Sequence, residues 1–167
     1  MTKKMMIVAF FGVFLLAAFA APSQAKWAAV GDVAPEFSLP MLSGQTLVSA
    51  DLVKKNKTVV ITFIQTACSA CKGEIVELNK LAKKSKAGIV VIPVAVDMRS
   101  GKEFLDNYKS ENAVDFDFGI DPKFSVPALF GMSFTPGTVV ISGGKVAKVF
   151  RGYDPEVAKE LATLFAK

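Results

Sequence analysis

The chain has 167 residues, of which 51% are hydrophobic and 21% charged, and its formal net charge is +5. This length fits one domain with a full hydrophobic core, and the scattered basic residues give no reason to expect nucleic-acid binding. The chain contains no histidine, which excludes a histidine general base and histidine ligands to zinc, copper or haem.

The first 25 residues have the pattern of a secretory signal peptide. Lys3 and Lys4 precede an almost wholly apolar stretch from residue 5 to residue 21, and small residues lead up to Ala25. We therefore expect a signal peptide over 1–25 and a mature domain over 26–167, exported to a bacterial periplasm or cell envelope. The apolar stretch is near the minimum for a membrane span, so an uncleaved N-terminal anchor is the alternative. Membrane contact is expected only in that case.

The first half of the mature chain alternates between strand and helix patterns. The expected elements are, in chain order, strands at 37–40 and 46–48, a helical turn from Ser49 to residue 54, a strand at 58–64 and a helix from Cys68 to about residue 85. Ser49 is expected to cap its helical turn. The run at 58–64 is apolar and rich in β-branched residues, which is typical of a buried central strand.

The second half continues the alternation. The expected elements are a strand at 89–96, a helix from Ser100 to about 111, a weaker strand at 116–120, a short helix at 123–129, a hairpin of strands 138–141 and 145–150, and a final helix capped by Asp154. In the helix after Ser100 we place Phe104, Leu105 and Tyr108 on the inner face. Buried strands alternating with amphipathic helices predict an α/β sandwich, and the hairpin adds an antiparallel part.

Cys68 and Cys71 are the only cysteines of the chain. They stand where the buried strand passes into a helix, and this spacing places both sulfurs within one helical turn. The helix N-terminus stabilises a thiolate and lowers the pKa of the first cysteine. A purely structural role is disfavoured, because so small a disulfide loop constrains the unfolded chain very little. We expect a redox-active disulfide.

Cofactors other than this disulfide are not expected. Two thiols alone do not complete a structural zinc site, although a site shared between two chains remains open. Attachment of a c-type haem requires His directly after the second cysteine, where this chain has Lys72.

Three segments together carry a family resemblance: 31–39 with its Gly-Asp-Val-Ala-Pro start, the strand and helix around the cysteines, and 134–141 with its Thr-Pro step. With the ending around 144–152, they resemble the exported TlpA/ResA-like branch of the thioredoxin fold, close to AhpC/TSA-type sequences. The resemblance covers essentially the whole mature chain. It implies a thioredoxin-like three-layer α/β/α sandwich with a mixed central sheet and an N-terminal β-hairpin extension.

The resemblance also implies residue roles. Cys68 is the exposed nucleophile, and Cys71 resolves the mixed disulfide. Glu74 is a candidate proton acceptor for Cys71, with a solvated carboxylate in the first helical turn as the alternative. Thr135–Pro136 is expected to be a cis peptide whose backbone edge binds substrate, the alternative being an ordinary trans turn.

Some positions depart from the family pattern. Ala67, which we place beside bound substrate, stands where many thioredoxin-like domains carry Trp. Thr62 occupies the place of the buried Asp of ordinary thioredoxins, and a hydroxyl cannot accept a proton as a carboxylate does.

The resemblance implies an exported thiol–disulfide oxidoreductase that reduces disulfides of client proteins, as in cytochrome c maturation, and that is fed by a membrane dithiol donor. A peroxiredoxin-like peroxide reductase is one alternative. For that alternative Thr66 stands two residues before Cys68 where the peroxiredoxin pattern has three, and Arg99 and Arg151 are the only arginines available. A non-catalytic binding or redox-sensing module is the other. Five phenylalanines could form its docking surface, although most of them are better explained as core residues: Phe116, Phe118, Phe124, Phe130 and Phe134.

Overall fold

The computed structural model describes residues 27–85, 88–97 and 101–165. The expected signal peptide therefore lies outside the described residues. The strands are β1 (Ser38–Pro40), β2 (Thr46–Val48), β3 (Thr58–Ile64), β4 (Ile89–Ala95), β5 (Gly119–Ile120), β6 (Gly137–Ser142) and β7 (Lys145–Arg151). The helices are α1 (Ser49–Lys55), α2 (Ser69–Lys84), α3 (Lys102–Asn112), α4 (Ser125–Leu129) and α5 (Pro155–Phe165).

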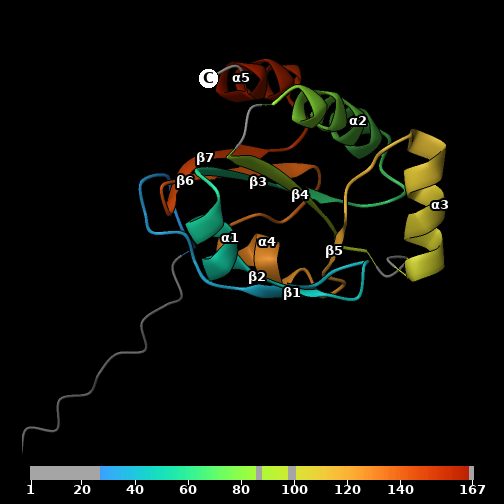
Figure 1. Cartoon of the computed structure of the whole chain (residues 1–167), viewed down its shortest axis with the longest axis horizontal. Helices are drawn as coiled ribbons and strands as arrows, with labels where there is room; N and C mark the ends of the chain where they lie inside the picture. The colour runs from blue at the N-terminus through green and yellow to red at the C-terminus, as the bar shows by residue number, and fades with distance from the viewer. Residues whose placement is uncertain (1–26, 86–87, 98–100, 166–167) are drawn as a thin grey trace, which may run out of the picture.

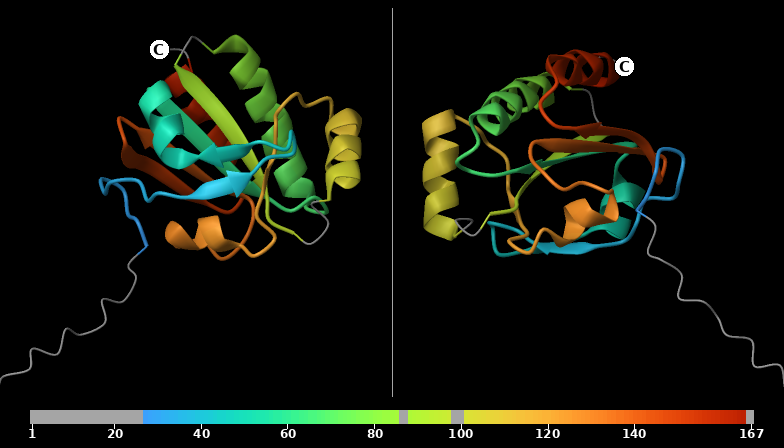
Figure 2. Two further views of the ribbon diagram at one scale, coloured as in Figure 1. Left: turned by 60° about the horizontal axis from the view of Figure 1, so that its bottom comes forward. Right: turned by 180° about the vertical axis from the view of Figure 1, so that it is seen from behind.

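The elements form three layers around one five-stranded sheet. Its strand order is β5-β4-β3-β6-β7, with β3 parallel to β4 and antiparallel to β6. Helices α2 and α5 cover one face, whereas α1, α4 and the β1–β2 hairpin cover the other, and α3 lies at the β5 edge (Figures 1 and 2). The α/β/α sandwich, the mixed sheet and the N-terminal hairpin are confirmed.

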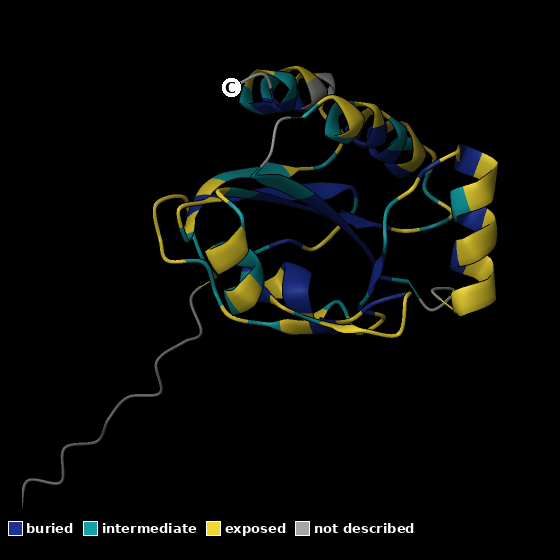
Figure 3. Cartoon of the chain, viewed as in Figure 1, coloured by how far each residue is buried: buried dark blue, intermediate teal, exposed yellow. Residues whose placement is uncertain are grey.

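Side chains from the central strands alternate between the two layers of the core. Val60 of β3 packs toward α2 and α5 with Leu78 and Leu161, whereas Ile61 and Phe63 pack toward the hairpin and α4. All five side chains are at most 1% exposed, and the central strands are buried over most of their length (Figure 3). In the described part of the chain, none of the helices has the length and apolarity that a membrane crossing requires.

Helix starts were predicted less well than strands. Asp154 does cap α5, because its Oδ1 accepts the backbone N–H of Glu156 at 2.9 Å. The expected cap by Ser49 is wrong: α1 begins at Ser49, whose Oγ instead accepts the N–H of Phe37 at 2.8 Å and ties the hairpin entry to the helix. Ser100 lies outside the described residues, and α3 starts after Gly101 without a side-chain cap.

Two further expectations near α3 need correction. Phe104 is 42% exposed, because the inner face of α3 is formed by Leu105 and Tyr108, which are buried. The strand expected at 116–120 is only Gly119–Ile120. The residues before it leave the sheet, since the Phe118 carbonyl accepts the N–H of Leu42 at 2.7 Å instead of pairing with β4.

Candidate active site

The two cysteines form a disulfide at the N-terminus of α2, with their Cα atoms 5.2 Å apart. Cys68 is the N-cap residue of the helix, and its Sγ accepts the backbone N–H of Cys71 at 3.1 Å. Cys68 is partly exposed, whereas Cys71 is 0% exposed in a cluster with Ile64 and Tyr108. One sulfur is therefore open to a partner and the other is enclosed, as a nucleophile and a resolving thiol require.

Glu74 lies one turn after Cys71 and is only 7% exposed. Its Oε1 accepts a hydrogen bond from Thr62 Oγ1 at 3.1 Å and a second one from Thr138 Oγ1. Burial raises the pKa of Glu74 above its ordinary value, and the two hydroxyl donors partly oppose that rise. The alternative of a solvated carboxylate is therefore wrong, because the side chain turns inward against the sheet.

The Thr135–Pro136 peptide is cis, as the resemblance implied. It immediately precedes β6, whose Gly137 pairs with Phe63 near the end of β3. Thr135 Oγ1 donates to Gln65 Oε1 at 3.3 Å, and Gln65 stands in the short loop that leads from β3 to Cys68. The fold thus brings the cis-proline loop beside the cysteine loop. Ala67 is exposed on that same loop.

Asp97 holds the other side of the cysteine loop. Its Oδ2 accepts the backbone N–H of Thr66 at 2.8 Å and the Thr66 hydroxyl at 2.6 Å. Burial, followed by the nearby Asp97 carboxylate, raises the pKa of Tyr108 to about 12. Sequence reasoning missed Asp97 and Gln65. A polar residue one or two positions after each of two adjacent parallel strands was the available signal, since Ile64 pairs with Ala95 at the ends of β3 and β4.

A family model of the AhpC/TSA family matches residues 30–149, which run from before the hairpin into β7. The chain belongs to the AhpC/TSA family.

Relatives of this AhpC/TSA chain share its fold, and one of them is named for thiol–disulfide exchange. It is 31% identical over 133 residues to a thioredoxin-like protein of Haemophilus influenzae, covering 79% of this chain and 76% of that protein. A protein from Chlorobium tepidum, named as the thiol:disulfide interchange protein DsbE, is 27% identical with a TM-score of 0.70, over 81% of this chain and 94% of that one. The fold is shared with the peroxidoxin BcpB of Mycobacterium tuberculosis, which is 19% identical with a TM-score of 0.68. That match covers 83% of this chain and 96% of that one.

The family, the thioredoxin-like fold and the CxxC disulfide make this chain a TlpA/ResA-like thiol–disulfide oxidoreductase. Its general substrates are proteins with thiols or disulfides.

The peroxide alternative finds little support around Cys68. The Arg151 guanidinium donates to the carbonyls of Phe130 and Gly131 near α4, at 3.1 and 3.4 Å. Arg99 lies outside the described residues.

In the described part, no group of three or more thiol or carboxylate side chains is placed to hold a metal ion.

Four of the five phenylalanines belong to or pack against the core, as expected for most of them, and do not form a docking surface. Phe118 and Phe130 are 0% exposed core residues, and Phe116 and Phe124 are partly buried against the core. Phe134, beside the cis peptide, is 53% exposed.

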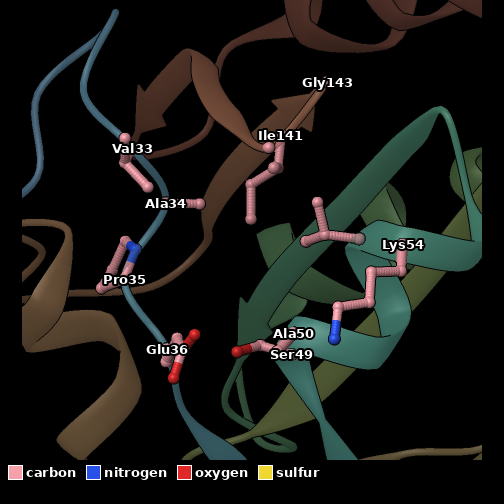
Figure 4. Close-up of a pocket in the computed structure, with 11 residues that line it drawn as sticks. Val33, Ala34, Pro35, Glu36, Ser49, Ala50, Lys54, Ile141 and Gly143 are labelled. Carbon is pink, nitrogen blue, oxygen red and sulfur yellow. The ribbon is translucent and has the colours of Figure 1, made fainter.

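A hollow elsewhere on the molecule is separate from the disulfide. Residues 33–36 line one side of it, and Ser49, Ala50 and Lys54 of α1 line the other (Figure 4). Ile141 contributes to its wall near the β6–β7 turn, and the neighbouring Ser142 pairs with Thr58 at the start of β3. Because Cys68 follows the opposite end of β3, this hollow takes no part in the redox site.

Proposed function

We propose that this enzyme works in the reducing direction on disulfides of client proteins outside the cytoplasm. The observation that carries the proposal is the pairing of a partly exposed Cys68 with an enclosed Cys71 one turn before a buried carboxyl group, Glu74. An open nucleophile, a protected resolving thiol and a nearby proton acceptor are the three groups that thiol–disulfide exchange uses in either direction. The reducing direction is the one that the TlpA/ResA-like resemblance supports.

The reaction begins with both cysteines reduced. The Cys68 thiolate, stabilised by the α2 N-terminus, attacks one sulfur of the client disulfide. A bond forms between Cys68 and that sulfur, the client S–S bond breaks, and the second client sulfur leaves with the electron pair and takes a proton from solvent. The product is a mixed disulfide between enzyme and client.

Resolution then depends on Cys71. Its thiol gives a proton to the Glu74 carboxylate, and the resulting thiolate attacks Cys68 Sγ. The Cys68–Cys71 bond forms, the bond to the client breaks, and the client sulfur leaves as a thiolate. The client is thus reduced by two electrons and the enzyme is oxidised by two. A dithiol donor at the membrane, in our proposal, returns the enzyme to its reduced form.

The cis-proline loop is the proposed substrate edge. It lies beside the cysteine loop through the Thr135–Gln65 hydrogen bond. We propose that the backbone at Thr135 and Pro136 pairs with an extended client segment, as an added strand pairs with a sheet edge, and that Ala67 faces the same segment. The exposed, small Ala67 leaves room for a client side chain.

Export and client class are further parts of the proposal. The N-terminal pattern supports cleavage after Ala25 and release into a bacterial periplasm or envelope. A c-type apocytochrome is the client class that the TlpA/ResA-like resemblance supports, because its Cys-x-x-Cys-His segment must be reduced before haem attachment.

Activity on a disulfide-linked Cys-x-x-Cys-His peptide tests the function directly. The reduced enzyme should release peptide thiols, and Cys68→Ser should abolish the release. Hydrogen peroxide is offered to the same enzyme in parallel. Peroxide consumption without peptide reduction would favour the peroxiredoxin alternative, and inactivity toward both would favour the binding module.

The mass of the chain recovered from an envelope fraction tests export. A first residue of Lys26 is the expected result. An intact N-terminus in the membrane pellet would support the uncleaved anchor instead.

A further inference from the structure

Thr62 and Thr138 stand directly opposite one another in the antiparallel register of β3 and β6. Thr62 is 0% exposed and Thr138 is 1% exposed. Both hydroxyls reach the same carboxylate oxygen, Glu74 Oε1, and their own oxygens are 3.0 Å apart. Three oxygen atoms from three separate elements therefore form a closed triangle in the layer between the sheet and α2.

A buried carboxyl group that gains and loses a proton meets a physical difficulty. The ionised form needs donors, whereas the protonated form needs an acceptor for its own O–H, and a buried polar group without its partner costs free energy. Most side-chain arrangements satisfy one form only. Threonine hydroxyls can serve both forms, because each hydroxyl donates one proton, accepts through its oxygen and rotates freely.

The triangle satisfies each form in turn. When Glu74 is ionised, Thr62 and Thr138 both donate to Oε1. When Oε1 carries the proton, it donates to Thr138 Oγ1, Thr138 turns to donate to Thr62 Oγ1, and Thr62 continues to donate to Oε1. Every hydroxyl proton keeps an acceptor in both forms. No atom other than the hydroxyl hydrogens needs to move.

We propose that Thr62 and Thr138 are positioning residues for the proton-acceptor function of Glu74, a hydroxyl pair that keeps its buried side chain hydrogen-bonded in both protonation states. The proposal rests on the function assigned above to Glu74. It adds the chemical reason that a buried carboxyl group can exchange a proton with Cys71 at this place without an opening of the core.

In the described part of the chain, the side-chain hydrogen bonds to Glu74 come from Thr62 and Thr138. The ionisable groups on the elements packed around it are the following. Strands β3, β4 and β6 carry no ionisable side chain. On α2, Cys71 precedes Glu74 by one turn, Lys72 is exposed, and Glu77 is exposed and paired with Lys80. Tyr108 of α3 lies in the cluster around Cys71.

Helix α5, which packs against α2, carries three charged side chains whose contacts the structure describes. These are Glu156, paired with Lys159, and Glu160, paired with Lys148 of β7. All of them have ion-pair partners of their own.

The test is a titration of the Glu74 carboxyl group in the disulfide form of the full chain. The titration is monitored by carbon-detected NMR with labelled glutamate. Thr138→Val keeps the shape of the buried side chain and removes the donor. We expect the carboxyl pKa to rise by about one to two units, the size of one lost hydrogen bond to a charged group. Thr62→Val should raise it in the same direction, and Thr138→Ser should restore the wild-type titration.

Thr46→Val is the matched control, because Thr46 is an exposed threonine of β2. It should leave the Glu74 titration unchanged. An unchanged titration in both Thr62→Val and Thr138→Val, with the fold intact by circular dichroism, would overturn the proposal. A Thr138→Ser variant that titrates like Thr138→Val would overturn it as well, because the hydroxyl would then not be the active group.

A second readout separates this inference from the function on which it rests. The rate at which Cys71 resolves a mixed disulfide is measured against pH in wild type and Thr138→Val. A pH profile that moves with the carboxyl titration supports both claims. A shifted carboxyl titration with an unmoved rate profile supports the hydroxyl pair and overturns Glu74 as the proton acceptor.

Discussion

The buried Glu74 carboxyl group makes the stability of the folded chain depend on pH in a direction that a single substitution reveals. Glu74→Gln replaces the carboxyl group with a neutral amide of nearly the same shape. The comparison uses the disulfide form, in which neither cysteine titrates. All other ionisable groups are shared by the two chains, so their contributions cancel in the difference of unfolding free energies.

The direction follows from the raised pKa of Glu74 in the folded state. Its ordinary value is 4.5, and the unfolded chain titrates near that value. Below it the carboxyl group is neutral in both states and burial carries no charge penalty. As the pH rises from 4.5 through the folded pKa, the folded state must bury a charge and wild type loses stability. Glu74→Gln has no such loss.

The magnitude is set by the extent of the pKa shift. Each unit by which burial raises the pKa corresponds to about 1.4 kcal/mol of unfolding free energy. At low pH the two chains should differ only by the fit of the amide, whose N–H₂ group faces two hydroxyls that can rotate to accept from it. The stability of Glu74→Gln relative to wild type should therefore increase with pH and reach a plateau once Glu74 is fully ionised.

Urea unfolding followed by circular dichroism, between pH 4 and pH 8, measures this difference. A relative stability that rises with pH by about 1.4 kcal/mol per unit of the shift titrated by NMR supports the account. A difference that stays flat across the range, or one that falls with pH, would refute the argument that Glu74 is buried and its pKa raised.

Two other groups give independent predictions. Cys71→Ser should accumulate a long-lived mixed disulfide with a client peptide, detected by mass spectrometry. Cys68→Ser should form no such mixed disulfide, and equal trapping by both variants would contradict the assigned order of attack. Tyr108, titrated by phenolate absorbance in a Tyr153→Phe background, should ionise with a pKa of about 12 because it is buried near Asp97. Asp97→Asn should lower that pKa, and an unchanged value would show that the Asp97 charge does not reach the phenol.

The sequence predicted the features that depend on local patterns. The apolar β-branched run gave β3, Asp154 before Pro155 gave the start of α5, and the spacing of Cys68 and Cys71 gave the disulfide. Each of these depends on residues that are neighbours in the chain, and their physical preferences act without help from distant segments.

Individual side-chain contacts between distant segments could not be predicted from the sequence. Glu74 was recognised by resemblance, but its burial depends on the register that sets Thr62 opposite Thr138. The contact between Thr66 and Asp97 likewise requires the pairing of β3 with β4. Ser49 does not cap α1, because its hydroxyl accepts the N–H of Phe37 from the hairpin entry, a contact between segments that the local pattern does not show.

The equilibrium reduction potential of the Cys68–Cys71 disulfide tests the central claim most directly. It is measured on the purified chain against glutathione or dithiothreitol buffers of known poise. A value below about −240 mV is the predicted result, because a reductant of client proteins must give up its electrons readily. A value between about −180 and −120 mV would contradict the reducing direction and indicate an oxidant or isomerase, and the absence of any reversible disulfide would contradict the redox function itself.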